Sequence, residues 1–314
     1  MKWLAALLLP LALLTLAVAC DEEEEEAARA RPSPAAAATA TPLVTPSPEA
    51  TPTPAPTQVQ PLASPGPSLP PLYIALGDSL AAGAGTSDPS SRAYVPLFHE
   101  YLREALGIAD LALMNLGHGG DTSTDLIEHG HLAKAVDEIR ARNFDESPDN
   151  DVEVVTLDIG GNDLLELFEG LVIPGTCPDV ETSMAKAECL NALQDALDGL
   201  SENFDQALDE LEQGDPGLPV LTADLYNPFS GSGLPFEELA ELALEGREGS
   251  PFEEGLNDVI RSIADEHGVA VADWHGPFQG KSAEFIAPDR IHANDAGYRV
   301  MTEALIAAYE ATAD

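Results

Sequence analysis

The chain has 314 residues, of which 55 are acidic and 14 basic, and its formal net charge at pH 7 is −41. This length is compatible with one or two domains. The acidic run Asp21–Glu26 supplies only six of the negative charges, so the folded part must also be acidic. Such a surface repels nucleic-acid phosphates and anionic lipid headgroups, which excludes nucleic acid as a partner.

The first 20 residues have the features of a bacterial signal peptide. Lys2 precedes an apolar stretch that Pro10 interrupts and that is short for a membrane span, which needs about 20 apolar residues. The sequence "LAVAC" resembles a lipobox, although Ala17 stands where leucine is usual. We therefore expect Cys20 to carry a lipid. An uncleaved anchor and ordinary secretion are the alternatives, and all three place the folded domain outside the cytoplasm.

Residues 21–71 combine an acidic run with a segment rich in Pro, Thr and Ala. The segment has almost no aromatic residues and no apolar period, so it cannot bury a core. We expect a disordered linker. A proline-rich chain of this kind extends by about 3.1 Å per residue and would hold a domain up to ~150 Å from its anchor.

Apolar runs and helical patterns alternate through residues 72–314, which we expect to form a single domain. Strands are predicted at Leu72–Leu76, Leu111–Leu116, Val152–Ile159, Pro219–Leu225 and Val269–Asp273. Helices are predicted at Tyr94–Leu106, Leu126–Arg142, Cys189–Leu211, Phe252–His267 and Ala296–Ala311. Near-continuous apolar strands are typical of a parallel sheet that is covered on both faces. The pattern predicts a doubly wound, flavodoxin-like α/β fold with a mostly parallel sheet of about five strands and helices on both faces.

Cysteine usage agrees with an oxidising compartment. If Cys20 carries lipid, Cys177 and Cys189 remain as an even pair separated by a short segment. We expect a disulfide between them. A metal site is the alternative, but no histidine lies near them at ligand spacing.

Polar residues gather directly after the predicted strands. The first strand is followed by "GDS", the second by "NLGHGGDTS" and the third by "IGGND", and "DRIHAND" precedes the last helix. Ligands of doubly wound sheets bind outside the carboxyl ends of the strands. These four blocks are therefore expected to share one crevice.

The four blocks resemble those of the SGNH hydrolases, also called the GDSL lipase/esterase family, over residues 72 to 313. The resemblance implies Ser79 as nucleophile and Asp289 and His292 as its catalytic partners. It implies an oxyanion hole formed by Ser79, Gly120 and Asn162. Two small departures are Gly119, where serine is common, and Ala293, where proline often follows the histidine.

The chemistry of these residue types supports the same roles. A serine hydroxyl is a weak nucleophile unless a base such as His292 takes its proton. Asp289 precedes His292 by three residues, a spacing that places both side chains on one side of a helical turn. There the carboxylate would hold the imidazole in the right tautomer. The Ser79 and Gly120 N–H groups and the Asn162 amide are suitable donors to an oxyanion.

Other polar residues of these blocks have structural explanations. We expect Asp78 and Asp163 to support turns, and Asp158 to pair with a neighbouring polar group inside its strand. His118, beside the oxyanion loop, either touches substrate or is simply exposed.

We expect no metal and no organic cofactor. His129 and His131 lie two residues apart in one predicted helix and so do not share a face, which argues against a metal site.

Together these features predict an extracytoplasmic serine esterase or lipase that forms an acyl-enzyme, works as a monomer and touches the membrane only through its N-terminal lipid. A carbohydrate O-deacetylase is the first alternative, and a non-catalytic glycan- or lipid-binding module is the second. Segments 164–188 and 227–250 look like insertions over the crevice. They are either an acyl-binding lid or packed scaffold.

Overall fold

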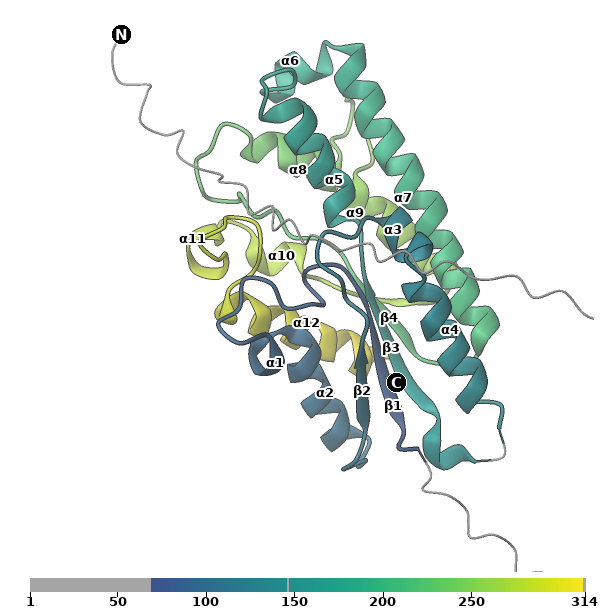
Figure 1. Ribbon diagram of the computed structural model, residues 1–314. Helices are drawn as coiled ribbons and strands as arrows, with labels where there is room; N and C mark the ends of the chain where they lie inside the picture. Colours follow the sequence, from purple (N-terminus) through teal and green to yellow (C-terminus); the bar gives the residue numbers. More distant parts are fainter. Residues whose placement is uncertain (1–68, 146, 313–314) are drawn as a thin grey trace, which may run out of the picture. The chain divides into compact units, whose positions relative to one another are not determined.

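The computed structural model describes residues 69–145 and 147–312 and contains one five-stranded parallel sheet (Figure 1). The strand order is β2-β1-β3-β4-β5. The strands are β1 (Leu72–Gly77), β2 (Ala112–Asn115), β3 (Val152–Asp158), β4 (Val220–Ala223) and β5 (Ala270–Ala272). This order is the flavodoxin-like, doubly wound one, so the predicted fold class is confirmed.

The central strand β1 shows why the sheet needs cover on both faces. Its six residues are all buried. Leu72, Ile74 and Leu76 belong to the apolar cluster on one face, and Tyr73 and Ala75 belong to the cluster on the other. Because successive side chains of a strand point to opposite faces, a continuous apolar run fills both cores at once.

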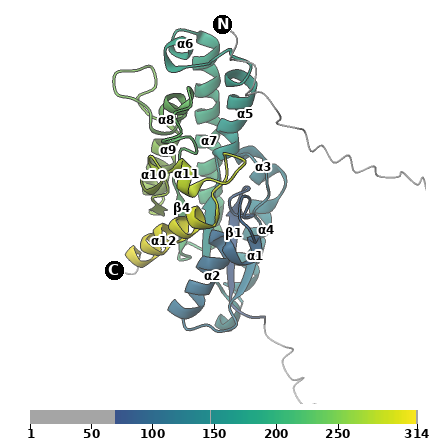
Figure 2. The same cartoon turned by 90° about the vertical axis from the view of Figure 1, so that its left-hand side faces the viewer.

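Long helices cover each face (Figures 1 and 2). One core is closed by α2 (Tyr94–Ala105) and α12 (Asp295–Ala311). The other is closed by α3 (Ser123–Glu128), α4 (His131–Arg142), α7 (Ala187–Gly214) and α9 (Leu256–Glu266). The remaining helices are α1 (Pro89–Arg92), α5 (Gly161–Leu167), α6 (Val180–Met184), α8 (Glu237–Glu245), α10 (His275–Phe278) and α11 (Ser282–Phe285), with a 3₁₀ turn at Pro148–Asn150.

The single helix predicted at Leu126–Arg142 is wrong. It is divided into α3 and α4 at Gly130, whose φ of 77° is in the left-handed region that favours glycine. Thr122 caps α3 by accepting a hydrogen bond from the Asp125 N–H, while the Asp125 carboxylate accepts one from the Thr122 N–H. The break turns the chain between His129 and His131, and it therefore changes where these two side chains point.

Two segments after β3 and β4 stand beyond the carboxyl ends of the strands. The first runs from α5 through the π-helix η2 (Phe168–Val172) to α6, and the second contains α8. A disulfide joins Cys177, in the loop before α6, to Cys189 in the first turn of α7. Both cysteines are buried with Val172 in a small apolar cluster against which Phe236 and Leu239 pack. The two segments thus contact each other through apolar side chains.

None of the helices in the described part of the chain is long and apolar enough to span a lipid bilayer. Cys20, the predicted signal peptide and almost all of the predicted linker lie outside the described residues.

Candidate active site

Ser79 lies just past the carboxyl end of β1, where the chain turns away from the sheet. The turn starts at Gly77, whose φ is 150°, and any Cβ added there would overlap the Asp158 carboxylate. The next residue, Asp78, accepts a hydrogen bond from the Leu80 N–H at 2.8 Å. The turn leaves the Ser79 side chain partly exposed, at the edge where the other strand ends converge.

Ser79, His292 and Asp289 form a continuous chain of hydrogen bonds. The His292 Nε2 atom lies 2.9 Å from Ser79 Oγ, and its Nδ1 atom lies 2.8 Å from Asp289 Oδ2. Ser79 Oγ has a longer contact of 3.4 Å with Asp78 Oδ1. The structure therefore brings together the three residues that the sequence analysis selected, although 213 positions separate Ser79 from His292.

The loop that carries Asp289 and His292 differs from the helical turn expected from their spacing. Arg290 between them has a φ of 67°, so the segment is an irregular turn, which precedes α12. Asp289 Oδ1 accepts hydrogen bonds from the Ile291 and His292 N–H groups, both at 3.0 Å. Partial burial would raise the pKa of Asp289, but these bonds and the one to the His292 ring outweigh it and keep the pKa below its usual value.

The three expected oxyanion donors also lie near one another. Gly119 is close enough that a Cβ added to it would stand 3.9 Å from the Ser79 Cβ. Gly120 has a φ of 92°, in the left-handed region that favours glycine. A Cβ added there would meet open space, so the backbone conformation and not a lack of room accounts for glycine at this position. Within the described residues, neither the Ser79 N–H nor the Gly120 N–H donates a hydrogen bond, which leaves both free for a ligand.

Asn162, in the first turn of α5, is held by two acceptors. Its Nδ2 atom donates to the Asp121 carbonyl at 2.8 Å and to Asp78 Oδ2 at 3.2 Å. The amide is therefore oriented by the Ser79 turn on one side and by the Gly120 loop on the other. Asp163 accepts two hydrogen bonds from Ser123 at the start of α3, in agreement with the structural role expected for it.

Two buried carboxyl groups lie beneath the turn. Burial raises the pKa of Asp78 to about 6, against the effect of the Leu80 hydrogen bond. Asp158 accepts a hydrogen bond from the Tyr94 hydroxyl, the kind of polar partner expected from the sequence. Its pKa is raised well above the usual value by burial and by the charge of Asp78. Both effects favour the neutral form of Asp158, which avoids two adjacent buried negative charges.

An apolar cavity opens beside this group of side chains. Ser79, Asn162 and His292 lie at its polar end, and most of the other lining residues are apolar. They include Leu165, Phe168 and Val172 from one inserted segment and Phe229, Leu239 and Ala240 from the other. The volume of about 140 Å³ is roughly ten times the 10–15 Å³ that a single water molecule requires. The two insertions thus form the walls of a cavity that an acyl chain could occupy.

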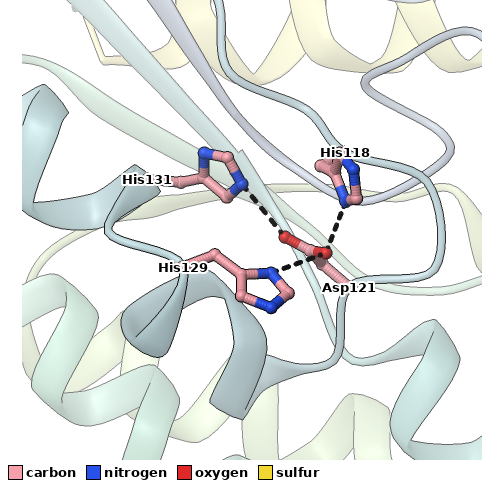
Figure 3. Close-up of side chains that lie close together, drawn as sticks. All are labelled: His118, Asp121, His129 and His131. Atoms are coloured by element: carbon pink, nitrogen blue, oxygen red, sulfur yellow. Dashed lines mark hydrogen bonds and ion pairs between the residues drawn. The ribbon is translucent and has the colours of Figure 1, made fainter. Parts of the chain in front are cut away.

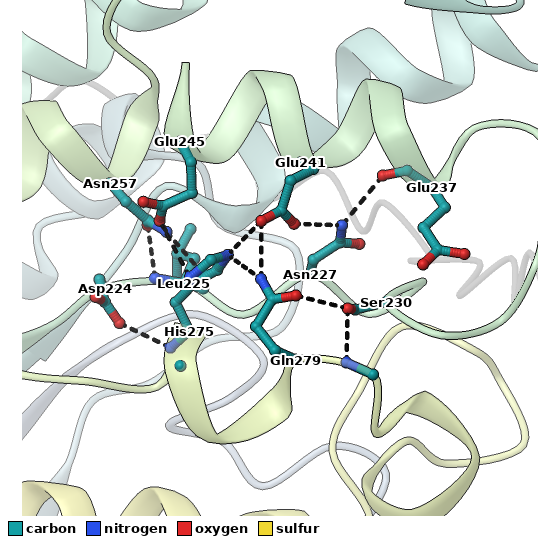
Figure 4. A network of polar contacts seen from close by, with 12 residues as sticks. Asp224, Leu225, Asn227, Ser230, Glu237, Glu241, Glu245, Asn257, His275 and Gln279 are labelled. Atoms are coloured by element: carbon teal, nitrogen blue, oxygen red, sulfur yellow. Dashed lines mark hydrogen bonds and ion pairs between the residues drawn. The ribbon is translucent and has the colours of Figure 1, made fainter. Parts of the chain in front are cut away.

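A partly buried polar network fastens α8 to the rest of the domain (Figure 4). Glu241 accepts hydrogen bonds from Asn227 at 2.9 Å and Gln279 at 2.8 Å, and lies 3.2 Å from His275 Nε2. On the next turn of α8, Glu245 accepts a hydrogen bond from Asn257 at 2.6 Å. The α8 wall is therefore held by polar contacts on its outer side and by apolar contacts on the cavity side.

The fold has the doubly wound strand order expected of a GDSL-type hydrolase, and the comparisons with known proteins agree. The sequence profile of the GDSL-like lipase/acylhydrolase family matches residues 75–300. The chain therefore belongs to this family.

Individual relatives are distant. The spore germination lipase LipC of Bacillus licheniformis is 23% identical over 242 residues, which cover 75% of this chain and 95% of LipC. The solved structure of a lipase from a goat rumen metagenome is 22% identical, with a TM-score of 0.57, and the match covers 76% of this chain and 97% of that lipase. An acetyl-xylooligosaccharide esterase from Geobacillus is 14% identical, with a TM-score of 0.50 and coverage of 76% and 94%. These structures share the fold with this chain.

Sequence analysis missed one group of side chains beside the site. His118, His129 and His131 all point at Asp121, which directly follows Gly120 (Figure 3). The argument that His129 and His131 cannot meet was wrong, because it assumed one helix where Gly130 separates two. The glycine between the two histidines was the only signal in the sequence for this break.

Proposed function

We propose that this protein is a serine carboxylic-ester hydrolase that works through an acyl-enzyme intermediate. The observation that carries the proposal is the unbroken contact from Asp289 through His292 to Ser79 at the mouth of an apolar cavity. In this proposal His292 takes the Ser79 proton as the hydroxyl attacks the ester carbonyl. Asp289 holds the ring orientation and stabilises the imidazolium that forms.

The second half of the reaction uses the same groups. Protonated His292 gives its proton to the leaving alcohol, and a water molecule, deprotonated by the same imidazole, then attacks the acyl-enzyme. The bond from the acyl carbon to Ser79 Oγ breaks, His292 returns the proton to Oγ, and the carboxylic acid leaves. Each attack places a negative charge on the former carbonyl oxygen. The free N–H groups of Ser79 and Gly120 would donate to that oxygen. The Asn162 amide would donate to it in place of its longer hydrogen bond, the one of 3.2 Å to Asp78 Oδ2.

The walls of the cavity favour esters with an acyl chain over acetyl esters. Leucine and phenylalanine side chains from both inserted segments line it, and burial of one methylene group contributes about 0.8 kcal/mol, a roughly fourfold effect on binding. A chain of several carbons would therefore gain substantially in kcat/KM over acetate. An acetyl group would leave most of the cavity empty.

We further propose that the domain works outside the cytoplasm, tethered by a lipid on Cys20 and by the linker 21–71. Support comes from the apolar leader, the lipobox-like "LAVAC" and the composition of the linker. The disulfide between Cys177 and Cys189 fits an oxidising compartment.

Hydrolysis of p-nitrophenyl esters of increasing chain length by the purified protein tests the proposal. We expect kcat/KM to rise from acetate through medium-chain esters and to fall when the cavity is full. Rapid turnover of acetate alone would favour a carbohydrate O-deacetylase. A folded protein without activity toward any ester, and without labelling by a serine-directed phosphonate, would instead indicate a binding module.

A further inference from the structure

Three of the seven histidines of the chain surround one buried carboxylate (Figure 3). Asp121 is only 2% exposed, and its Oδ1 atom lies 2.6 Å from His118 Nδ1 and 3.2 Å from His129 Nδ1. His131 Nε2 lies 3.3 Å from the other oxygen, Oδ2. One ligand atom from each of the four residues can be chosen so that all of them lie within 4.8 Å of one another.

Three separate pieces of chain supply these side chains. His118 and Asp121 belong to the loop after β2, His129 is the C-cap of α3, and His131 is the first residue of α4. The left-handed backbone of Gly130 turns the chain between the last two, so both rings face Asp121 from different helices. The convergence thus depends on tertiary structure and not on helical spacing.

We propose that this cluster binds one divalent transition-metal ion, with the imidazoles of His118, His129 and His131 and the carboxylate of Asp121 as ligands. Three imidazole nitrogens and one carboxylate oxygen are a donor set that suits zinc and its neighbours in the first transition series. Calcium and magnesium prefer ligand sets made of oxygen atoms. The proposed site is separate from the Ser79 chemistry and does not depend on it.

The geometry needs only a small adjustment. Zinc–ligand distances of about 2.0–2.1 Å in a tetrahedron place ligand atoms ~3.3–3.4 Å apart. In the structure the four ligand atoms lie within 4.8 Å of one another, so the tetrahedron requires ring movements of at most about 1.5 Å. The His118 and His129 side chains are at least half exposed, so their rings have room to rotate and an ion has a path of entry.

A second observation points to a ligand independently of the histidines. Asp121 Oδ2 is buried, and within the described residues it accepts no hydrogen bond, although His131 Nε2 lies 3.3 Å from it. A buried carboxylate oxygen without a partner is costly, and a cation at this position would satisfy it. The strongly negative charge of the whole chain adds a favourable long-range field for cations.

Metal binding at this position would stiffen the loop beside Ser79. Asp121 directly follows Gly120, and its carbonyl accepts the 2.8 Å hydrogen bond from Asn162. An ion held by His118, His129 and His131 would therefore tie this loop to α3 and α4. We assign the ion a structural role, in which it raises thermal stability.

Metal titration of tag-free, full-length protein stripped with EDTA tests the proposal. We expect one Co²⁺ per chain with visible d–d absorption, displacement of Co²⁺ by Zn²⁺, and a higher melting temperature with zinc. His129→Gln and His131→Gln should each weaken binding by about tenfold or more. His118→Gln should weaken binding to a similar extent. Because His118 is the most exposed of the ligands, this variant can replace either of the other two if that one fails to fold.

His267→Gln is the matched control, because His267 belongs to a different cluster with Asp209 and Glu212. This variant should bind the ion as the unmodified protein does. The proposal is overturned if no ion binds stoichiometrically. It is equally overturned if the cluster variants, folded in EDTA with unchanged melting temperature, keep full affinity, or if binding is lost only in His267→Gln.

Discussion

The reactivity expected of Ser79 depends on the ring beside it. With Nε2 of His292 at 2.9 Å from Ser79 Oγ, the proton of the hydroxyl has an acceptor along the line of an existing contact. The Asp289 carboxylate, with its pKa lowered, stays ionised and available to stabilise the imidazolium. These groups act together, so removal of any one should abolish most of the rate enhancement that the others provide.

We predict that Ser79→Ala and His292→Ala each abolish ester hydrolysis and leave the fold intact. The double variant should be little worse than either single one, because the two residues act as a unit. A serine-directed phosphonate should label the unmodified protein at Ser79, as peptide mass spectrometry would show. Substantial hydrolysis by Ser79→Ala would contradict the assignment of the nucleophile.

We predict that Asn162→Ala lowers kcat by about 10²–10³-fold with a much smaller change in KM. The reason is that a donor to the oxyanion is worth more in the transition state than in the bound ester, and removal of one such donor costs roughly 3–4 kcal/mol. Asn162→Asp should be no better, because it presents an acceptor to a negative oxygen.

Melting temperature, measured on the same preparations, separates this role from a structural one. Asn162 also joins Asp78 to the Asp121 carbonyl, so some loss of stability is expected on the mutation. A near-normal kcat accompanied by a large fall in melting temperature would show that the amide only supports the turn.

At the scale of elements, the wall formed by α8 should set the preference for chain length. Ala240 lines the cavity, and tryptophan at this position would fill space that an acyl chain needs. We predict that Ala240→Trp lowers kcat/KM for medium-chain esters by at least tenfold and changes the value for acetate far less.

Ala307→Trp is a suitable control, because Ala307 is exposed on α12. Both variants would be compared on the same series of p-nitrophenyl esters. An equal loss on all esters in Ala240→Trp would indicate a general disturbance of the fold, and no loss on any ester would mean that the acyl chain binds elsewhere.

The polar network behind α8 should make thermal stability depend on pH. The pKa of Glu241 is lowered to about 2, chiefly by its hydrogen bond with His275. Partial burial would lower the pKa of His275, but the hydrogen bond with Glu241 and the charge of Glu245 outweigh it, so the pKa is raised. The contribution of Glu241 is complete above its usual pKa of 4.5 and is lost as the pH falls toward 2.

The contribution of His275 has the opposite sign: it is complete below the usual pKa of 6.5 and is lost as the pH rises through the raised value. The pair should therefore stabilise the protein fully between pH 4.5 and 6.5. We predict that His275→Gln reduces the decline of melting temperature above pH 6.5. Thermal scans across this range would measure it, and parallel curves for the two proteins would contradict the prediction.

At the scale of the whole molecule, the N-terminal segment should decide where the enzyme works. We predict that Cys20→Ser, expressed in a bacterial host, prevents incorporation of labelled palmitate and releases activity from the membrane fraction. The hydrolase domain itself should be unaffected, because Cys20 lies outside residues 72–314. Unchanged membrane association of the variant would favour an uncleaved anchor, and soluble, unlabelled wild-type protein would favour ordinary secretion.

Much of the fold and of the site could be predicted from local sequence. The apolar runs around Leu72–Leu76 and Val152–Ile159 identify strands buried on both faces, and their order in the chain implies a parallel, doubly wound sheet. The polar blocks that follow them had to meet, because the carboxyl ends of parallel strands share one edge. These blocks contain Ser79, Gly120 and Asn162. His292 precedes the last helix and was assigned through the resemblance to the GDSL family.

The tertiary structure alone decided what depends on contacts between distant or irregular segments. The apolar cavity arises only where the insertions after β3 and β4 pack against each other, and no period in the sequence indicates that pairing. The histidine cluster depends on one left-handed glycine, Gly130, which redirects the chain between two helices. The local sequence indicates which segments prefer a strand or a helix. The direction in which a side chain points after a helix is interrupted is set by the tertiary packing around it.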